Sequence, residues 1–312
     1  MIEKGKPDIL HIHWQHPFLL SSTKLKTILK STIFILEIIL LKLMGIKIIW
    51  TVHNIVNHEK IFSNIELFFG KILAKLCDKL IVHCPYAKKE VIRVFNITSS
   101  TVCVIPHGNY NYENRIDKSK AREILNLNES DKVLLYFGQI RPYKGVDNLI
   151  KAFKEINAKG IKLLIAGKPF NRQIATEIIE ASKNNENIII IFKFVPDNEI
   201  QIYMNASDIM VLPYKDILTS GAVMLAMSFG KFIITPAIGC NLDILNGTGN
   251  VLYDPNYEKA LTVAIQKAID IPSKDLIKIG RHNYKASKRY CWIWIAKRTY
   301  ELYMEIVRRP ND

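Results

Sequence analysis

Two cations, Arg141 and Lys144, stand three residues apart in the stretch FGQIRPYKGVDNLIKAF, with Gly138 before them and Gly145 after. The apolar run KVLLYFG predicts a strand that ends here, and VDNLIKAF predicts the start of a helix. The N-terminal end of a helix attracts anions, arginine grips two phosphate oxygens in a fork, and lysine adds a point charge. We therefore predict a diphosphate site at this turn, rather than two solvated loop cations.

A second group, Thr219, Ser220 and Gly221, follows the strand-like run DIMVLP where another helix is expected to begin. Serine or threonine at such a position caps the helix by accepting a hydrogen bond from its first turn. The backbone N–H groups of the same turn can also hold a phosphate or ribose oxygen. The sequence leaves both interpretations open, a cap alone and a cap that also contacts a ligand.

Histidines form the third group. The run WTVHN ends a predicted strand with His53, which makes this residue a candidate to face a ligand from the first half of the chain. In HIHWQHP, His11 and His13 share one face of a strand, but the spacing places no third ligand, so no metal site is predicted. Five scattered cysteines without a CxxC pair predict no zinc site either.

Alternating apolar runs and helical stretches must position these groups. Runs that are apolar at every position are typical of parallel strands buried on both faces, and strand–helix alternation favours a doubly wound α/β fold. In such sheets, ligands bind outside the carboxyl ends of the strands. The predicted strands are DILHIHW, IKIIWTVHN, KLIVHC, TVCVIPHG, KVLLYFG, IKLLIAG, NIIIIFKF, DIMVLP and KFIITP. The predicted helices cover 24–44, 63–77, 85–95, 145–159, 171–184, 197–206 and 219–229.

A chain of 312 residues suits two domains. The alternation breaks in a polar, turn-rich stretch, which we interpret as a linker over 111–130. The linker divides an N-terminal domain, 1–110, from a C-terminal domain, 131–285, and leaves 286–312 as a terminal segment.

The net charge is +14, which suits anionic lipid or phosphorylated small molecules, although abundant lysine alone could produce it. No block of five Lys or Arg and no nucleic-acid-binding motif is present, so nucleic acid is not expected as a partner. The N-terminus MIEKGKPDILHIHW lacks the apolar core of a signal peptide, which favours the cytoplasm.

Residues 25–44 are very apolar, but Lys30, Glu37 and Lys42 interrupt them, which disfavours a transmembrane helix. Two interpretations stay open. One is a largely buried core helix. The other is a helix lying on the inner membrane surface, with Lys24, Lys26 and Lys30 near lipid phosphates.

Together these motifs resemble the GT-B glycosyltransferases, and within them glycosyltransferase family 4. PDILHIHW and IKIIWTVHN are similar to the family's first-domain strands, and CDKLIVHCPYAKKEVIRVFNITSSTVCVIPHG to the segment that ends that domain. LLYFGQIRPYKGVDNLIKAF resembles its donor-phosphate motif, and NEIQIYMNASDIMVLPY its next landmark. CWIWIAKRTYELYMEI resembles its closing helix, which implies that 286–312 crosses back to the first domain.

The resemblance implies two Rossmann-like, doubly wound domains that face a cleft, the first on the acceptor side and the second binding a nucleotide sugar. It implies transfer of mannose or a similar hexose from a GDP- or UDP-linked donor to a lipid-linked or polysaccharide acceptor, with retention and without a metal ion or other cofactor. The implied catalytic residues are Arg141 and Lys144, at the diphosphate, and His53, near the transferred sugar. The candidate donor-binding residues are Gly138, Gln139, Gly167, Val195, Asp216, Thr219, Ser220 and Gly221.

The chain departs from the family pattern in three places. Gln139 stands where the family often has arginine, a role that Arg141 could take over. Ile217 and Leu225 occupy the positions of the family's two E-x7-E glutamates, so neighbouring Asp216 or the following hydroxyls would have to substitute. The first domain also looks shortened at its start, which a partner chain could complete. A non-catalytic GT-B subunit that binds nucleotide sugar or a partner chain is therefore the alternative.

Overall fold

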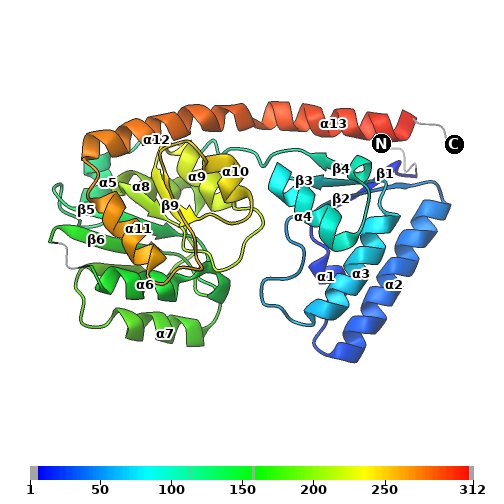
Figure 1. Ribbon diagram of the computed structural model, residues 1–312, viewed down its shortest axis with the longest axis horizontal. Coiled ribbons are helices and arrows are strands. Elements are labelled where there is room, and N and C mark those ends of the chain that lie inside the picture. The colour runs from blue at the N-terminus through cyan, green and yellow to red at the C-terminus, as the bar shows by residue number, and fades with distance from the viewer. Residues whose placement is uncertain (1–5, 113, 157–158, 309–312) are drawn as a thin grey trace. The chain divides into compact units, whose positions relative to one another are not determined.

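The computed structural model describes residues 6–112, 114–156 and 159–308, which divide into two compact units (Figure 1). The first unit contains the described residues up to His107 together with those from Trp292 onward, and the second is Gly108–Cys291. Each unit has a parallel sheet, of four strands in the first and six in the second. The predicted class, two parallel α/β domains, is confirmed, and the first unit has the smaller sheet.

The first sheet runs in the simple order β1-β2-β3-β4. Its strands are β1 Ile9–Ile12, β2 Lys47–Thr51, β3 Lys79–Val82 and β4 Val102–Val104. Its helices are α1 His16–Leu19, α2 Lys24–Leu43, α3 Ser63–Leu76, α4 Pro85–Phe95 and α13 Trp292–Arg308. The strand order never reverses here, so the doubly wound order belongs to the second sheet.

Helices cover both faces of the first sheet because successive residues of a strand point to opposite sides. Ile49 and Ile81 form one cluster with Ile295, Leu302 and Ile306 of α13. On the other face, the Trp50 ring lies 5.3 Å, centroid to centroid, from the ring of Phe95 in α4. The last helix of the chain therefore completes the core of the first unit.

The second sheet has the order β10-β9-β8-β5-β6-β7, which reverses between β8 and β5. Its strands are β5 Lys132–Phe137, β6 Ile161–Ala166, β7 Ile188–Ile191, β8 Ile209–Val211, β9 Phe232–Pro236 and β10 Val251–Tyr253. Its helices are α5 Lys118–Ile124, α6 Val146–Lys154, α7 Arg172–Ser182, α8 Ile200–Ala206, α9 Gly221–Ser228, α10 Cys240–Leu245, α11 Ala260–Ile269 and α12 Ser273–Ser287. The reversal makes the carboxyl ends of β5 and β8 the place where a ligand is expected.

The stretch 111–130 is not a linker. It contains α5, and the fully buried Arg122 of that helix donates hydrogen bonds to the carbonyl oxygens of Ala206, Asn128 and Glu129. Arg122 also pairs with Asp208, at 2.9 Å, and Asp208 accepts a hydrogen bond from the backbone of β5. The sequence looks like a loop because Arg122 and its polar partners form this internal network, so the predicted linker is wrong, whereas the division between the units, after His107, lies close to the predicted end of the first domain at 110.

Helix α2 is not a largely buried core helix. Its inner face buries Thr27, Ser31, Phe34, Ile35 and Ile38, and the Ser31 hydroxyl donates to the Leu19 carbonyl at 2.8 Å. Its other apolar side chains are exposed, apart from the half-buried Leu41. Across the described parts of the chain, no helix has the length and hydropathy needed to cross a membrane.

Candidate functional site

The loops that follow β5 and β6 lie side by side beyond the ends of their strands. The Gly138 N–H donates to the Ala166 carbonyl at 3.0 Å, and the Ile140 N–H donates to the Lys168 carbonyl at 3.0 Å. A Cβ atom on Gly167 would lie 1.8 Å from the Gly138 carbonyl oxygen. This close approach explains glycine at position 167, whereas Gly138 has open space around it and a positive φ of 128°, which favours glycine. The two backbone hydrogen bonds hold the start of the cation-bearing turn in place.

The end of the same turn is fastened to the loop that follows β8. Gly145 has a positive φ of 72°, and a Cβ atom there would lie 2.0 Å from the Pro213 carbonyl oxygen. The Lys215 N–H donates to the Tyr143 carbonyl at 2.8 Å. Glycine alone fits this junction, which fixes the backbone on either side of Lys144 at the switch point of the sheet.

Lys144 is a mostly buried cation. Its Nζ lies 4.5 Å from the centroid of the Tyr214 ring and 5.1 Å from that of Tyr143. Burial, assisted by the charge of Arg141, lowers the pKa of Lys144 to about 8. Within the described ranges no carboxylate pairs with it. A desolvated ammonium without a counter-ion is costly, so this position favours a bound anion.

Arg141 lies beside this lysine and is held by two neighbours. Its Nε donates to the side-chain oxygen of Gln139 at 3.0 Å, and its guanidinium carbon lies 4.4 Å from the centroid of the Phe170 ring. Stacking and the hydrogen bond restrict the orientation of the guanidinium. Gln139 therefore positions Arg141, and α6 begins directly after the turn with its N-terminal end at the same edge.

The predicted group at the start of α9 is mainly structural. The Ser220 hydroxyl accepts from the Val223 N–H at 3.2 Å and pairs with the Tyr214 hydroxyl at 2.7 Å, and Ser220 is buried. The Ser220 side chain thus caps α9 and also holds the Tyr214 ring on which Lys144 lies. Thr219 is half-buried, with its hydroxyl 3.5 Å from the Cys240 sulfur. Gly221 begins α9, and Asp216 is exposed.

The two positions at which the family pattern has glutamates are core positions in this chain. Ile217 and Leu225 are buried in one apolar cluster with Val195. The carbonyl of Ile217 also lies 2.3 Å from where a Cβ atom of Gly239 would be, so this loop is tightly packed. The side chains of Ile217, Leu225 and Val195 are therefore part of the apolar core.

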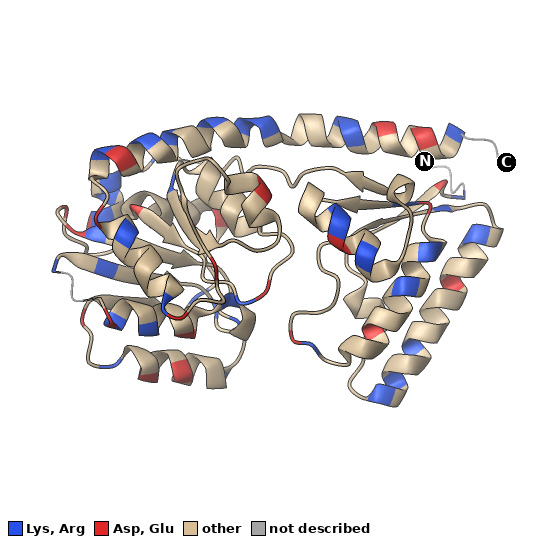
Figure 2. Ribbon diagram, viewed as in Figure 1, with Lys and Arg blue, Asp and Glu red and all other residues tan. Residues whose placement is uncertain are grey.

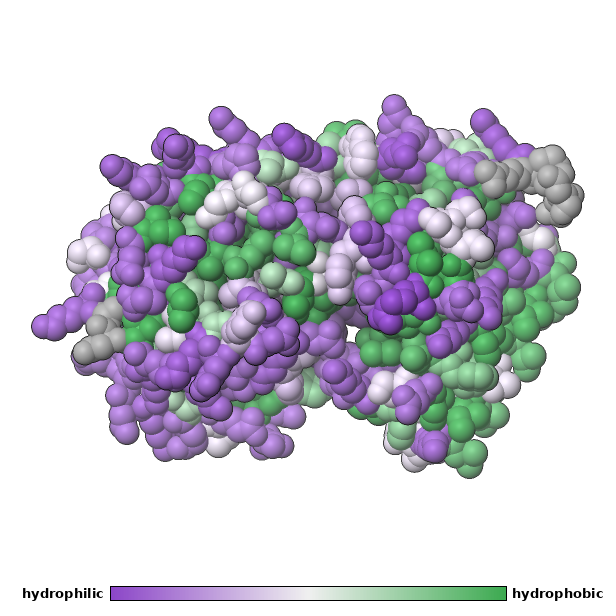
Figure 3. Space-filling view, viewed as in Figure 1, coloured by the Kyte–Doolittle hydropathy of each residue, from purple (hydrophilic) through white to green (hydrophobic). Residues whose placement is uncertain are grey.

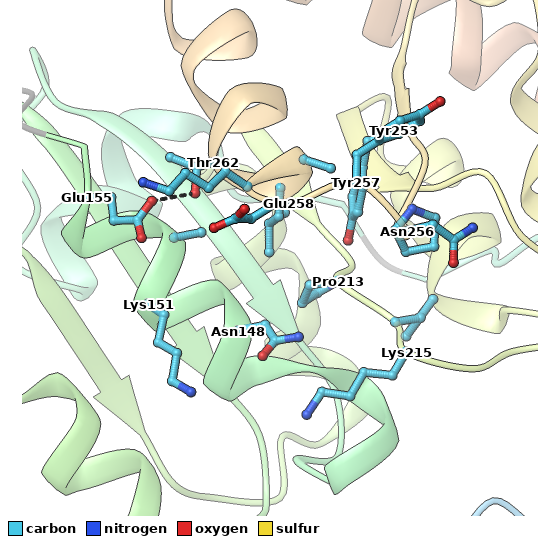
Figure 4. A pocket seen from close by; sticks show the side chains of 16 residues that line it. Asn148, Lys151, Glu155, Pro213, Lys215, Tyr253, Asn256, Tyr257, Glu258 and Thr262 are labelled. Carbon is cyan, nitrogen blue, oxygen red and sulfur yellow. Dashed lines mark hydrogen bonds between the residues drawn. The ribbon is translucent and has the colours of Figure 1, made fainter.

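A pocket of about 510 Å³ lies beside this edge in the second unit (Figure 4). α6 contributes Asn148 and Lys151 to its wall, and Glu155, the residue directly after the helix, adds a carboxylate. The Thr262 hydroxyl donates to Glu155 at 3.1 Å. Neither cation of the turn lines this pocket, and its wall carries both signs of charge, which suits a diphosphate less well than the turn does.

The carboxyl edge of the first sheet carries a row of histidines. His13, His53, His83 and His107 follow β1, β2, β3 and β4 in turn. Adjacent rings along this row have centroids 5.7, 5.1 and 5.7 Å apart, and the exposed Trp14 stacks on His53 at 4.4 Å. Only His53 was predicted as a site residue. The signal for the others was that each apolar run ends in histidine, as in HIHW, TVHN, IVHC and IPHG.

Hydrogen bonds connect three of these rings. His13 Nδ1 lies 3.4 Å from His53 Nε2, His53 Nδ1 lies 3.3 Å from His83 Nε2, and His83 Nδ1 lies 2.9 Å from the Ile105 carbonyl oxygen. Burial lowers the pKa of His53 to about 3 and that of His83 to about 4, with repulsion between neighbouring imidazoles adding to both. Partial desolvation, at a ring that still has one side open to solvent, also lowers the pKa of His13. All three rings are therefore neutral at pH 7.

His11 belongs to a separate pair of contacts. Its Nε2 lies 2.7 Å from the Thr51 hydroxyl and its Nδ1 2.5 Å from the hydroxyl of Tyr303 in α13. Burial lowers the pKa of His11 to about 4. Over residues 6–112, 114–156 and 159–308, no three His, Cys, Asp or Glu side chains are grouped so as to hold a metal ion.

Two family profiles match the chain. Residues 117–285 match "Glycosyl transferases group 1", and residues 1–108 match "Glycosyltransferase Family 4". The two matches meet close to the boundary between the structural units.

Curated relatives and solved structures agree with these profiles. The chain is 25% identical over 297 residues to a GDP-mannose:glycolipid 4-beta-D-mannosyltransferase of Xanthomonas campestris pv. campestris, covering 89% of this chain and 78% of the relative. Among solved structures, sucrose-phosphate synthase from Thermosynechococcus elongatus aligns with a TM-score of 0.77 at 18% identity, over 96% of this chain and 73% of that one. Anabaena HepE in complex with UDP-glucose aligns at 0.76 and 18%, over 96% and 79%.

Proposed function

This chain belongs to the group 1 glycosyltransferases, and from that membership we propose that it transfers a hexose such as mannose from a GDP- or UDP-linked donor to a lipid-linked or polysaccharide acceptor. The proposal includes retention at the anomeric carbon and no requirement for a metal ion. The chain is a transferase, and the donor, the acceptor and the stereochemistry are the proposed part.

One observation supports the donor site, namely the mostly buried cation Lys144 beside Arg141 at the switch point of the second sheet. A nucleoside diphosphate gains negative charge as the bond to the sugar breaks. Fixed cations at that place stabilise the transition state more than the ground state, because they need no reorganisation when the charge develops. A diphosphate also supplies the counter-ion that Lys144 otherwise lacks.

Named relatives support the choice of donor and acceptor. The Xanthomonas relative is named for GDP-mannose and a glycolipid. HepE was solved with UDP-glucose and, separately, with UDP. We therefore place GDP first and UDP second among donor nucleotides, and a glycolipid first among acceptors.

Calorimetric titration of the full chain with GDP, UDP and ADP tests the donor site. We expect tight binding of one diphosphate, and at least tenfold weaker binding in Arg141→Ala and in Lys144→Ala. Lys151→Ala is the control, because Lys151 is an exposed lysine on the adjoining helix. A full panel without binding would remove the nucleotide-sugar donor from the proposal.

Turnover with a polyprenol-linked or glycolipid acceptor then tests transfer, and proton NMR of the product gives the anomeric configuration. A chain that binds the donor and makes no product with any acceptor would support the non-catalytic alternative. The buried Ile217 and Leu225, which stand where the family carries glutamates, are the observation that keeps this alternative in view.

The exposed face of α2 supports a membrane-bound acceptor. Large apolar side chains recur on it every three or four residues, and lysines stand in its first two turns (Figure 2). The space-filling view shows hydrophobic side chains gathered over α2 and α3 (Figure 3). The exposed stripe consists of Leu25, Leu29, Ile33, Leu36, Leu40 and Leu43.

We infer that this face lies on an anionic lipid surface rather than against a second copy of the chain. Lys24, Lys26 and Lys30 would repel their counterparts in a helix pair, whereas each basic residue near anionic lipid contributes about 1 kcal/mol of binding. An amphipathic helix with such a face binds in the plane of the interface.

Vesicle co-sedimentation tests the α2 surface. A triple variant, Leu29→Gln, Leu36→Gln and Leu40→Gln, should lose binding to vesicles that contain anionic lipid. Ile179→Gln, an exposed isoleucine of the second unit, is the control and should bind as the wild type does. A concentration-dependent dimer in light scattering that the triple variant abolishes, with vesicle binding unchanged, would assign the face to a second copy.

A further inference from the structure

We propose that His13, His53 and His83 form a proton relay, in which Nε2 of His13 accepts the proton of the attacking acceptor hydroxyl. This inference rests on the proposed transfer reaction and adds to it a base and a path for the proton. It assigns catalytic work to the first unit through residues that follow three different strands, β1, β2 and β3.

The backbone fixes the direction of the relay. The Ile105 carbonyl can only accept a hydrogen bond, so His83 carries its proton on Nδ1. Neutral His83 then has a bare Nε2, which must accept from His53 Nδ1. Neutral His53 has a bare Nε2 in turn, which must accept from His13 Nδ1. The chain of contacts therefore leaves the lone pair of His13 on Nε2.

That lone pair is available. His13 is exposed at the end of its strand, and within the described parts of the chain nothing hydrogen-bonds to its Nε2. Trp14, also exposed, stacks on His53 and provides an aromatic surface beside the base. Sugars present an apolar face that packs on aromatic rings, so this neighbour suits a glycan or glycolipid headgroup.

The proposed step balances without another reactant. The O–H bond of the acceptor breaks, its proton goes to His13 Nε2, and its electron pair forms the new glycosidic bond. The bond between the anomeric carbon and the diphosphate breaks, and that electron pair leaves with the nucleotide. His13 then passes its Nδ1 proton to His53, and His53 passes its own to His83, which keeps its bond to the Ile105 carbonyl. The proton returns to water when the product leaves.

Other imidazoles of the row, after burial, lower the pKa of His53 and of His83, which suits a relay better than a store of charge. Among the described residues of the first unit, the side chains with ring contacts to the three rings include His11 at His13, Trp14 at His53 and His107 at His83, while Tyr303 contacts His11. None of them is a carboxylate, so no fixed negative charge holds a proton on the row. His13 therefore holds the proton only briefly, which suits a general base because it must release that proton before the next turnover.

Nitrogen-15 NMR of histidine-labelled protein tests the hydrogen-bond chain without any turnover. A solvent-exposed neutral histidine side chain favours the proton on Nε2, whereas the hydrogen-bond chain predicts that His13, His53 and His83 all carry it on Nδ1 at pH 7. His282, exposed on α12, serves as the internal reference with the ordinary tautomer. An Nε2-protonated His53 or His83 would overturn the relay, whatever the activity of the protein.

Kinetics test the base. His13→Gln keeps a donor for His53 but cannot take a proton, and we expect a fall in kcat of about 100-fold or more with an unchanged KM for the donor. His13→Ala should be similarly slow and should recover with added imidazole, because the site is exposed. His282→Gln is the control and should match the wild type.

The pH profile adds a readout that a structural role would not change. Burial lowers the pKa of His13 below its ordinary value of 6.5, so wild-type kcat/KM should fall only as the pH drops below that value. His13→Gln should lose this limb. A wild type that transfers sugar while His13→Gln keeps full kcat would refute the relay and leave the transferase intact. A wild type without transfer would instead refute the proposed function, with the tautomers still deciding the relay.

Discussion

Lys144→Met should make the protein more stable while it abolishes donor binding. Burial lowers the pKa of Lys144 from 10.5 to about 8, so keeping this ammonium charged in the folded state costs about 3 kcal/mol. Methionine fills the space of the lysine stem without a charge. It gives up the contact between the ammonium and the Tyr214 ring, which is worth about 1 kcal/mol. The net expectation at pH 7 is a gain of about 2 kcal/mol in the free energy of unfolding.

The pH dependence separates this cause from simple repacking. The folded pKa is depressed, so the full penalty on the wild type is present below pH 8, where Lys144 is charged in both states. The penalty declines between about pH 8 and 10.5 and disappears above 10.5, where the lysine is neutral in both states. The advantage of Lys144→Met should decline over the same interval.

Urea unfolding in a phosphate-free buffer measures the difference, because bound phosphate would stabilise the wild type alone. Lys151→Met is the matched control, since it removes an exposed lysine and should change stability by less than about 0.5 kcal/mol. GDP should stabilise the wild type and Lys151→Met but not Lys144→Met. A methionine variant that is less stable than wild type at pH 7, or one that GDP still stabilises, would refute the reasoning.

Two further predictions concern the frame around the cations. In Gly145→Ala the new Cβ atom would combine a positive φ with a contact of 2.0 Å to the Pro213 carbonyl oxygen. At Gly160 φ is 73°, but no atom lies within 4 Å of the new Cβ position. Thermal denaturation should therefore show a larger loss of stability for Gly145→Ala than for Gly160→Ala. Gly145→Ala should also weaken GDP binding in titration, whereas Gly160→Ala should not. Arg122→Met should lower the free energy of unfolding, measured in urea, by about 3–5 kcal/mol, because Asp208 and several carbonyl oxygens lose their buried partner. A loss below about 1 kcal/mol would mean that α5 contributes little to the stability of the second unit.

Apolar runs and helix-boundary residues in the sequence predicted the strands and helices whose formation depends on neighbouring residues. The run KVLLYFG became β5, and IKLLIAG became β6, because strands buried on both faces need an apolar side chain at nearly every position. The predicted helix 85–95 begins at a proline and ends at Phe95, as expected. Helix α6, predicted to reach 159, ends at Lys154, where the chain tightens into a turn with the Ile156 N–H bonded to the Phe153 carbonyl.

The two candidate sites differ in whether their residues lie close together in the sequence. Arg141 and Lys144 lie in one turn, so a single motif was enough to bring them together as one candidate site. The histidine row depends on the pairing order of β1, β2, β3 and β4, which places residues 13, 53, 83 and 107 side by side. No local pattern contains that order. The polar stretch 111–130 misled for a related reason, because the acceptors for Arg122 include a residue more than eighty positions further along the chain.

The path of the chain has a consequence for its synthesis. The first unit is interrupted after His107 and resumes only at Trp292, so the ribosome makes all of the second unit before it makes α13. Until then Ile49 and Ile81 have no cover on one side of their sheet. The second unit is contiguous in the sequence, so we expect it to fold first. During that time the segment up to His107 exposes the apolar face of its sheet that α13 later covers. An expression vector that stops before residue 292 should consequently yield an aggregation-prone product, whereas 108–291 alone should be the fragment that can be produced in folded form.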